Sequence, residues 1–247
     1  MNLENLKKYS YLKGLNVGQA EKDYYQNLIL FILYNKFSKE IVFKGGTALA
    51  KCYGLNRFSE DLDFTVREEK DYITIIDQGL NDFNIVHSIK EEKTIQNSRK
   101  YKIKINGPLY KGSERTLCSI TVDLSFREPV VGEPNLVTIG YHMDVIPVFD
   151  VYVLKEEEIF AEKVRALMMR SSARDLYDLV FLLDKEVTPN FSLIEKKLEL
   201  TNKKFSKKEF LGRCKNISSI WNNELKSLVK TVPSFEEYYK KIKDKID

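Results

Sequence analysis

Apolar positions recur with two different periods along this chain. Up to about residue 150, short apolar or alternating runs are interleaved with segments of helical periodicity. This interleaving predicts an α+β (or α/β) fold built on a mixed sheet. The predicted strands are 40–44, 62–66, 84–89, 101–105 and 119–126, and the predicted helices are 16–37, 47–54 and 68–83.

Beyond residue 150 the pattern is helical almost to the end of the chain. Pro233 lies near the start of the last helical segment, a position where proline is well tolerated. The chain is therefore expected to contain an α/β domain over residues 1–150 and an α-helical domain over residues 151–247. The helices predicted in the second domain are 156–170, 173–184, 191–199, 206–229 and 234–246.

Composition is typical of a globular protein of the cytoplasm. Of the 247 residues, 43% are hydrophobic and 31% are charged. No apolar run approaches the length of a membrane span, and the N-terminal residues lack the hydrophobic region of a signal peptide. Three widely separated cysteines fit a reducing compartment, and the presence of only two histidines argues against a histidine-based site.

Positive charge is concentrated near the C-terminus. Residues 201–247 carry 12 Lys and Arg against 6 Asp and Glu, whereas the whole chain has a formal net charge of only +4. A basic region of this kind could follow the phosphate backbone of a nucleic acid. A solvated, lysine-rich helical surface explains the same composition equally well.

Two aspartates alternate with apolar residues in the strand predicted over 62–66. Asp61 and Asp63 would point to one face of this strand, and Leu62 and Phe64 to the other. Two carboxylates held this close repel each other unless a cation lies between them, and hard oxygen ligands favour Mg²⁺. The alternative is a structural salt bridge, for which Arg57 is the nearest partner.

A glycine pair follows the first predicted strand. Gly45 and Gly46 precede Thr47 at an expected helix start, where phosphate oxygens can approach backbone N–H groups. The strand–helix–strand spacing would place this turn at the same end of the sheet as Asp61 and Asp63. The alternatives are a simple tight turn for the glycines and a helix cap for Thr47.

Asp123 is a third strand aspartate, on the face opposite to Val122 and Leu124. If its strand neighbours the strand of Asp61 and Asp63, Asp123 completes a three-carboxylate site for two metal ions. The alternative is a solvent-facing aspartate in an amphipathic strand.

Further charged residues lie in two of the predicted C-terminal helices. Ser172 and Asp175 have the spacing of a capping box, and Arg174 and Asp178 have that of an i,i+4 ion pair. Lys163 falls outside both pairs and could neutralise triphosphate charge as a point cation.

Taken together, these motifs resemble the AbiEii family, which contains nucleotidyltransferase-like toxins of bacterial abortive-infection toxin–antitoxin systems. The family is related to the MenT toxins and, more widely, to the DNA polymerase β superfamily. The resemblance covers about residues 40–184, in order. The segments that carry it are Phe43-Lys-Gly-Gly-Thr-Ala-Leu, Arg57-Phe-Ser-Glu-Asp-Leu-Asp-Phe, Glu162-Lys-Val-Arg-Ala-Leu and Arg174-Asp-Leu-Tyr-Asp-Leu.

The resemblance implies a minimal nucleotidyltransferase fold followed by a helical C-terminal domain. It also implies Mg²⁺-dependent transfer of nucleotides from an NTP, in some relatives onto the 3′ end of tRNA, and a cognate antitoxin as a possible partner. In that framework the basic region beyond residue 200 would dock the acceptor.

The resemblance also implies roles for particular residues. Asp61 and Asp63 match the family's metal aspartates, and Asp123 lies where the superfamily has a third carboxylate. Lys163, Asp175 and Asp178 match the later motifs, and which of these two aspartates is essential stays open. The residues expected to bind the nucleotide are Gly45, Gly46, Thr47, Arg57, Ser59 and Lys163.

Three other functions share part of this pattern. In a catalytically silent nucleic-acid-binding partner the aspartates would be structural or would bind metal without turnover. A protein-modifying nucleotidyltransferase would use the same site. A two-metal nuclease needs the carboxylates but has no triphosphate to hold in a Gly-Gly-Thr turn. NTP preference and the oligomeric state have no signature in the sequence.

Overall fold

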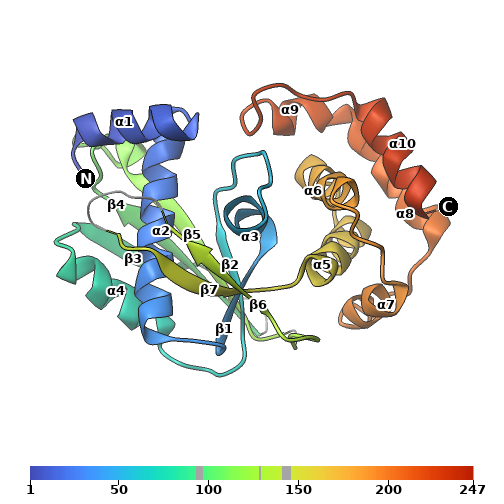
Figure 1. Cartoon of the computed structure of the whole chain (residues 1–247), viewed down its shortest axis with the longest axis horizontal. Helices are drawn as coiled ribbons and strands as arrows, with labels where there is room; N and C mark the ends of the chain where they lie inside the picture. The colour runs from blue at the N-terminus through green and yellow to red at the C-terminus, as the bar shows by residue number, and fades with distance from the viewer. Residues whose placement is uncertain (93–96, 128, 141–145, 247) are drawn as a thin grey trace. The chain divides into compact units, whose positions relative to one another are not determined.

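The structure, a computed structural model, describes residues 1–92, 97–127, 129–140 and 146–246. Its backbone forms two compact units, and neither is one continuous segment (Figure 1). The first unit comprises Met1–Ala48, Glu60–Pro129 and Pro134–Val153, and the second comprises Leu49–Ser59, Val130–Glu133 and Leu154–Asp247. The domain boundary expected at residue 150 stays a prediction.

A mixed sheet forms the centre of the first unit. Among the described residues it has seven strands in the order β3-β4-β5-β2-β1-β7-β6. Strand β2 is antiparallel to β1 and parallel to β5, while β1 is parallel to β7, so the predicted mixed sheet is confirmed. The strands are β1 (Ile41–Lys44), β2 (Leu62–Val66), β3 (His87–Glu92), β4 (Ser98–Ile105), β5 (Cys118–Ser125), β6 (Asn135–Ile139) and β7 (Phe149–Val153).

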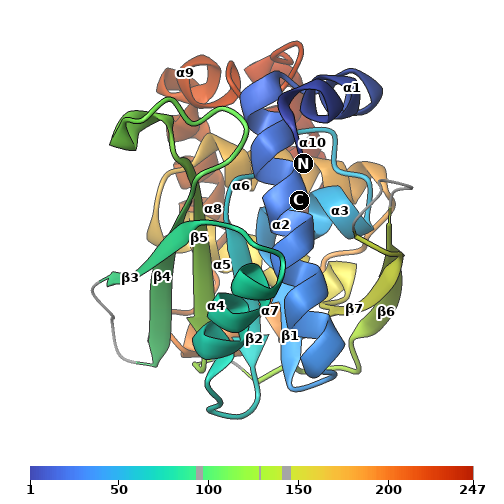
Figure 2. The ribbon, with the colours of Figure 1, turned by 90° about the vertical axis from the view of Figure 1, so that its left-hand side faces the viewer.

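One face of this sheet is apolar and packs against helices. Phe43, Phe64 and Leu124 point to this face, and all three are buried. Helices α2 (Val17–Lys36) and α4 (Tyr72–Asp82) lie over it (Figure 2). The opposite face therefore carries the polar residues that alternate with these apolar ones.

The other helices of the first unit are short. Helix α1 (Leu3–Lys13) packs on α2, and a 3₁₀ turn covers Glu114–Thr116. Helix α3 (Gly45–Cys52) begins in the first unit and ends in the second. None of the described helices is long and apolar enough to cross a membrane.

The second unit is helical. Helix α5 packs against α6, α7 and α8, and α6 also contacts α9 and α10. The helices are α5 (Glu156–Met169), α6 (Ala173–Asp184), α7 (Phe191–Glu199), α8 (Lys207–Asn216), α9 (Trp221–Leu225) and α10 (Phe235–Ile246).

The single helix predicted over 206–229 is wrong, because the chain breaks into α8, a 3₁₀ turn over Ile217–Ser219 and α9. The Ser219 hydroxyl donates to the Asn216 carbonyl at 3.2 Å. Serine and asparagine side chains compete with the helical hydrogen bonds in this way.

Several boundaries in the first unit also differ from the prediction by two to four residues, and two of them have a clear local cause. Helix α4 starts at Tyr72 rather than near residue 68, because the Asp71 side chain caps it by accepting from the Thr74 N–H at 3.1 Å. The next strand starts at His87 rather than at residue 84. Asn84, with φ of 54°, belongs to the turn that ends α4.

Candidate functional site

Five charged residues form one row across the sheet of the first unit, which we call the carboxylate row. Asp63 on β2 lies in register with Asp123 on β5 and, on its other side, with Lys44 on β1. Lys100 on β4 lies opposite Asp123, and Glu92 on β3 lies opposite Lys100. Register partners share a face, and neighbouring strands are about 4.8 Å apart. The condition on which the role of Asp123 depended, that its strand neighbours β2, is met.

Asp61 comes one residue before β2 and two before Asp63, so strand alternation directs it to the same face. Its backbone carbonyl accepts a hydrogen bond from the Thr47 hydroxyl. Thr47 is only 1% exposed. The hydroxyl of Thr47 thus fastens the first turn of α3 to the start of the carboxylate strand.

Gly45 lies directly against the Asp63 carboxylate. A Cβ atom on Gly45 would collide with the Asp63 Oδ2 atom, and the backbone φ of Gly45 is +78°. Both facts require glycine, since other residues rarely adopt positive φ. The turn predicted to bind phosphate is therefore in contact with a predicted metal aspartate.

The Asp123 carboxylate is held by a side chain from β4. The Ser98 hydroxyl donates to Asp123 Oδ1 at 2.8 Å. Two residues further along, Ser125 on β5 lies in register with Thr65 on β2. Both hydroxyls are buried, and neither has a hydrogen-bond partner in the described part of the chain.

The three aspartates have the right chemistry for a hard divalent cation, because they offer carboxylate oxygens from two adjacent strands. Within the described residues, no three His, Cys, Asp or Glu side chains lie close enough together to hold a metal ion. The chemistry of the donor set thus fits a hard divalent cation, while the oxygens of the described residues are not gathered around one point.

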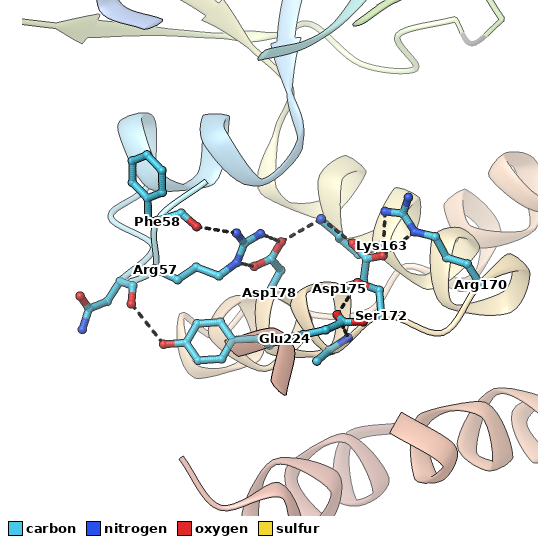
Figure 3. A network of polar contacts seen from close by, with 11 residues as sticks. Arg57, Phe58, Lys163, Arg170, Ser172, Asp175, Asp178 and Glu224 are labelled. Carbon is cyan, nitrogen blue, oxygen red and sulfur yellow. Dashed lines mark hydrogen bonds and ion pairs between the residues drawn. The ribbon is translucent and has the colours of Figure 1, made fainter. Parts of the chain in front are cut away.

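A buried ionic network occupies the second unit (Figure 3). Lys163 Nζ lies 2.7 Å from Asp175 and 2.8 Å from Asp178. Arg57 binds both oxygens of Asp178, at 2.6 and 2.7 Å. Arg170 completes the network through its contact with Asp175 at 2.9 Å.

Electrostatic attraction outweighs burial at Asp175 and at Lys163. Burial alone would raise the pKa of Asp175, but the charges of Lys163 and Arg170 lower it to about 2. Burial would likewise lower the pKa of Lys163, yet the two aspartates raise it. Lys163 and Asp175 therefore stabilise each other's charged forms, and the donors of Lys163 are directed at carboxylates of the same unit.

The sequence-based pairings of Ser172 and Arg174 are wrong. Ser172 makes no side-chain cap at the start of α6. Glu224 does so instead, by accepting from the Ala173 N–H at 2.9 Å. Asp178 is fully buried and pairs with Arg57 and Lys163 rather than with Arg174.

The residues predicted to bind the nucleotide thus fall into two groups. Gly45, Gly46 and Thr47 belong to the first unit, whereas Arg57, Ser59 and Lys163 belong to the second. Arg57 is 6% exposed, and its guanidinium is engaged by Asp178. Arg57 was considered as a partner for Asp61 and Asp63, and that pairing is not observed.

Ser98 and Lys100 were not recognised as site residues from the sequence. Their alternation on β4 is visible in the sequence, but their positions beside Ser125 and Asp123 depend on strand pairing. Such pairing joins segments about 25 residues apart and has no local signal.

Comparison with known proteins identifies a family. Residues 29–241 match the family described as "Nucleotidyl transferase AbiEii toxin, Type IV TA system". A sequence search of curated proteins found no match.

Two solved structures have a similar fold. MenT4, a nucleotidyltransferase toxin from Mycobacterium tuberculosis, is 18% identical with a TM-score of 0.69 over 100% of this chain and 88% of that one. JHP933 from Helicobacter pylori is 20% identical with a TM-score of 0.64 over 92% and 90% of the two chains. The family match covers most of the chain and includes both the carboxylate row and the buried network. The chain therefore belongs to the AbiEii family of nucleotidyltransferase toxins of type IV toxin–antitoxin systems.

Proposed function

We propose that this nucleotidyltransferase transfers a nucleotide from an NTP to an RNA acceptor, the 3′ end of tRNA, with Mg²⁺ bound by Asp61 and Asp63. The observation that carries the proposal is the contact between Gly45 and the Asp63 carboxylate. It joins a glycine turn at the start of a helix to a row of carboxylates, as triphosphate chemistry requires.

The first turn of α3 would hold the triphosphate. The first four N–H groups of a helix have no partner within the helix and favour anions. Gly45 and Gly46 let phosphate oxygens approach the backbone, while Thr47 keeps the turn fixed to Asp61. The phosphates and the carboxylates thereby meet at one end of the sheet.

The three aspartates would hold a divalent cation beside the reacting atoms. The bound cation supplies positive charge at the phosphates and lowers the pKa of the attacking hydroxyl. Asp61 and Asp63 would hold this cation, and Asp123, whose carboxylate accepts from Ser98, would be a third ligand. The acceptor hydroxyl oxygen would form a bond to the α-phosphorus and give its proton to solvent water, while the bond between the α-phosphorus and the bridging oxygen breaks and pyrophosphate leaves.

The buried network would position residues rather than touch the substrate. Arg57 comes four residues before Asp61 in the chain, and its pairing with Asp178 anchors the segment that leads from α3 into β2. Lys163 holds Asp175 and Asp178 in place. The expectation that Lys163 contacts pyrophosphate stays a prediction, and the observed pairing favours the positioning role.

The test is transfer of label from each α-³²P-labelled NTP to bulk tRNA in the presence of Mg²⁺. Label on tRNA is expected with the parent protein and should be lost in an Asp61→Asn/Asp63→Asn variant. Glu60→Gln is the matched control, because Glu60 is the adjacent carboxylate and pairs with Lys22 outside the row. Label on protein would replace the RNA acceptor with a protein acceptor. Full activity of the double variant would refute the site.

A cognate antitoxin is the partner proposed for this chain, because the family belongs to toxin–antitoxin systems. Expression of the parent protein, but not of the double variant, should arrest growth, and co-expression of the antitoxin should relieve the arrest.

A further inference from the structure

Four lysines of β3 and β4 lie on the same sheet face as the aspartates, and of these only Lys100 belongs to the row described above. Lys100, Lys102 and Lys104 alternate along β4, and Lys90 on β3 lies in register with Lys102. Lys100 is also in register with Asp123. These four residues, the lysine strip, therefore extend from the carboxylate row across the two neighbouring strands.

The lysine strip is exposed to solvent. Lys100, Lys102 and Lys104 expose 43%, 42% and 33% of their side-chain surfaces, and Lys90 is also exposed. These side chains are thus accessible to a large ligand.

Few carboxylates neutralise the strip. Glu92 lies 3.9 Å from both Lys100 and Lys102, the outer limit of an ion pair, and Glu114 pairs with Lys104. Lys90 has no ion pair among the residues that the structure describes. Within the described residues, the four lysines thus form ion pairs with two carboxylates, and a third, Asp123, lies in register with Lys100.

This arrangement costs stability in the isolated protein. Lys90 and Lys102 lie directly opposite each other, and like charges in that position repel. An anionic ligand that lies along the strip removes the repulsion. Successive lysines on β4 are about 7 Å apart, so the ligand must carry repeated negative charges along its length.

We propose that the lysine strip docks the sugar–phosphate backbone of the RNA acceptor and leads its end to the carboxylate row. The proposal rests on the proposed function, because it assumes that the acceptor is RNA. It assigns docking to the strip rather than to the basic region beyond residue 200. In that region Lys241 pairs with Asp184 at 2.7 Å, and Arg213 pairs with Glu209 at 2.9 Å.

The experiment compares two variants with the same change in charge. Lys90→Gln/Lys102→Gln/Lys104→Gln removes three charges from the strip and leaves Lys100 beside Asp123. Lys208→Gln/Lys215→Gln/Lys230→Gln removes three exposed charges from the C-terminal region. Binding of fluorescein-labelled bulk tRNA is measured by anisotropy between 50 and 200 mM salt, together with Mg²⁺-NTP binding.

The strip variant should bind the labelled tRNA at least about 10-fold more weakly at low salt. The slope of its plot of log affinity against log salt concentration should become less negative by about 2 to 3, because three phosphate contacts are lost. The C-terminal variant should stay within about 3-fold of the parent, and NTP binding should be unchanged in both. Equal weakening in both variants, or a larger effect of the C-terminal one, overturns the proposal.

Two outcomes separate this proposal from the proposed function. If tRNA binding depends on the strip but no label is transferred, the docking proposal is supported and the proposed transfer to tRNA is refuted. If label is transferred to tRNA while the strip variant binds like the parent, the transfer reaction stands and the docking surface falls. Thermal unfolding checks the fold of the strip variant, which should be at least as stable as the parent because repulsion has been removed.

Discussion

Gly45 and Asp63 are in direct contact, and the backbone of Gly45 has a positive φ of 78° that favours glycine. The two residues belong to different motifs in the sequence, one a glycine turn and the other a carboxylate strand. Their contact means that neither motif can change without displacing the other.

Gly45→Ala should abolish nucleotidyl transfer, because its methyl group must displace the Asp63 carboxylate. Gly54→Ala is the matched control, since Gly54 has a φ of +82° but no atom within 4 Å of the added carbon. Both variants should lose about 1 kcal/mol of unfolding free energy from the strained backbone. Loss of label transfer in Gly45→Ala alone would support the contact, and equal activity losses would contradict it.

Thr65→Val should leave the unfolding free energy unchanged or raise it. The Thr65 hydroxyl is buried without a partner among the described residues, so its desolvation is not compensated. Ser98→Ala is the comparison, because it removes a hydrogen bond of 2.8 Å to Asp123 and should cost about 1 kcal/mol. Urea unfolding of both variants gives the measurement. A clear loss in Thr65→Val would show that its hydroxyl has a partner, such as a bound water.

Asp175 should make the protein sensitive to acid. Its pKa of about 2 lies below the ordinary value of 3.8, so its contribution to stability is present above pH 4 and is lost as the pH falls toward 2. Asp175→Asn should therefore lower the unfolding free energy at neutral pH by about 2 kcal/mol and flatten its decline between pH 4 and 2. Asp244→Asn, at an exposed position of α10, is the control and should leave the plot of unfolding free energy against pH unchanged, as measured by urea unfolding at each pH. Parallel curves for parent and Asp175→Asn would rule out this contribution.

Glu224→Ala should destabilise the second unit more than Ser172→Ala does. Glu224 accepts from the Ala173 N–H at the start of α6, whereas Ser172 makes no cap. Loss of an N-terminal cap typically costs about 1 kcal/mol. Thermal unfolding distinguishes the two variants, and the reverse order would restore Ser172 as the cap.

Much of the fold follows from local periodicity. Strand β2 matches its predicted bounds of Leu62–Val66, because alternating and apolar residues define it without ambiguity. Strands β6 and β7 and helix α1 were not predicted. Leu136 on β6 is 56% exposed, so this edge strand has no strong apolar pattern, and the parallel pairing of β7 with β1 is non-local.

The candidate site shows the same limit. Alternation places Asp61 and Asp63 on one face from the sequence alone, but the position of Asp123 opposite Asp63 depends on the register of β2 and β5. The pairing of Arg57 with Asp178 was missed because the two residues are 121 positions apart. Local spacing suggested Arg174 instead, yet burial selects the partner that satisfies a fully buried carboxylate.

Because Arg57 and Asp178 are 121 positions apart, the ribosome adds them to the chain at clearly different times. At about 5 to 20 residues per second, the ribosome adds Asp178 roughly 6 to 24 s after Arg57. During this interval the segment Leu49–Ser59 has been made, but α6, the helix of the same compact unit that carries Asp178, has not. A nascent chain can thus begin to form its sheet while the Arg57 guanidinium is still hydrated. Only after α6 has been synthesised can this side chain become buried, because Asp178 of α6 is its ion-pair partner.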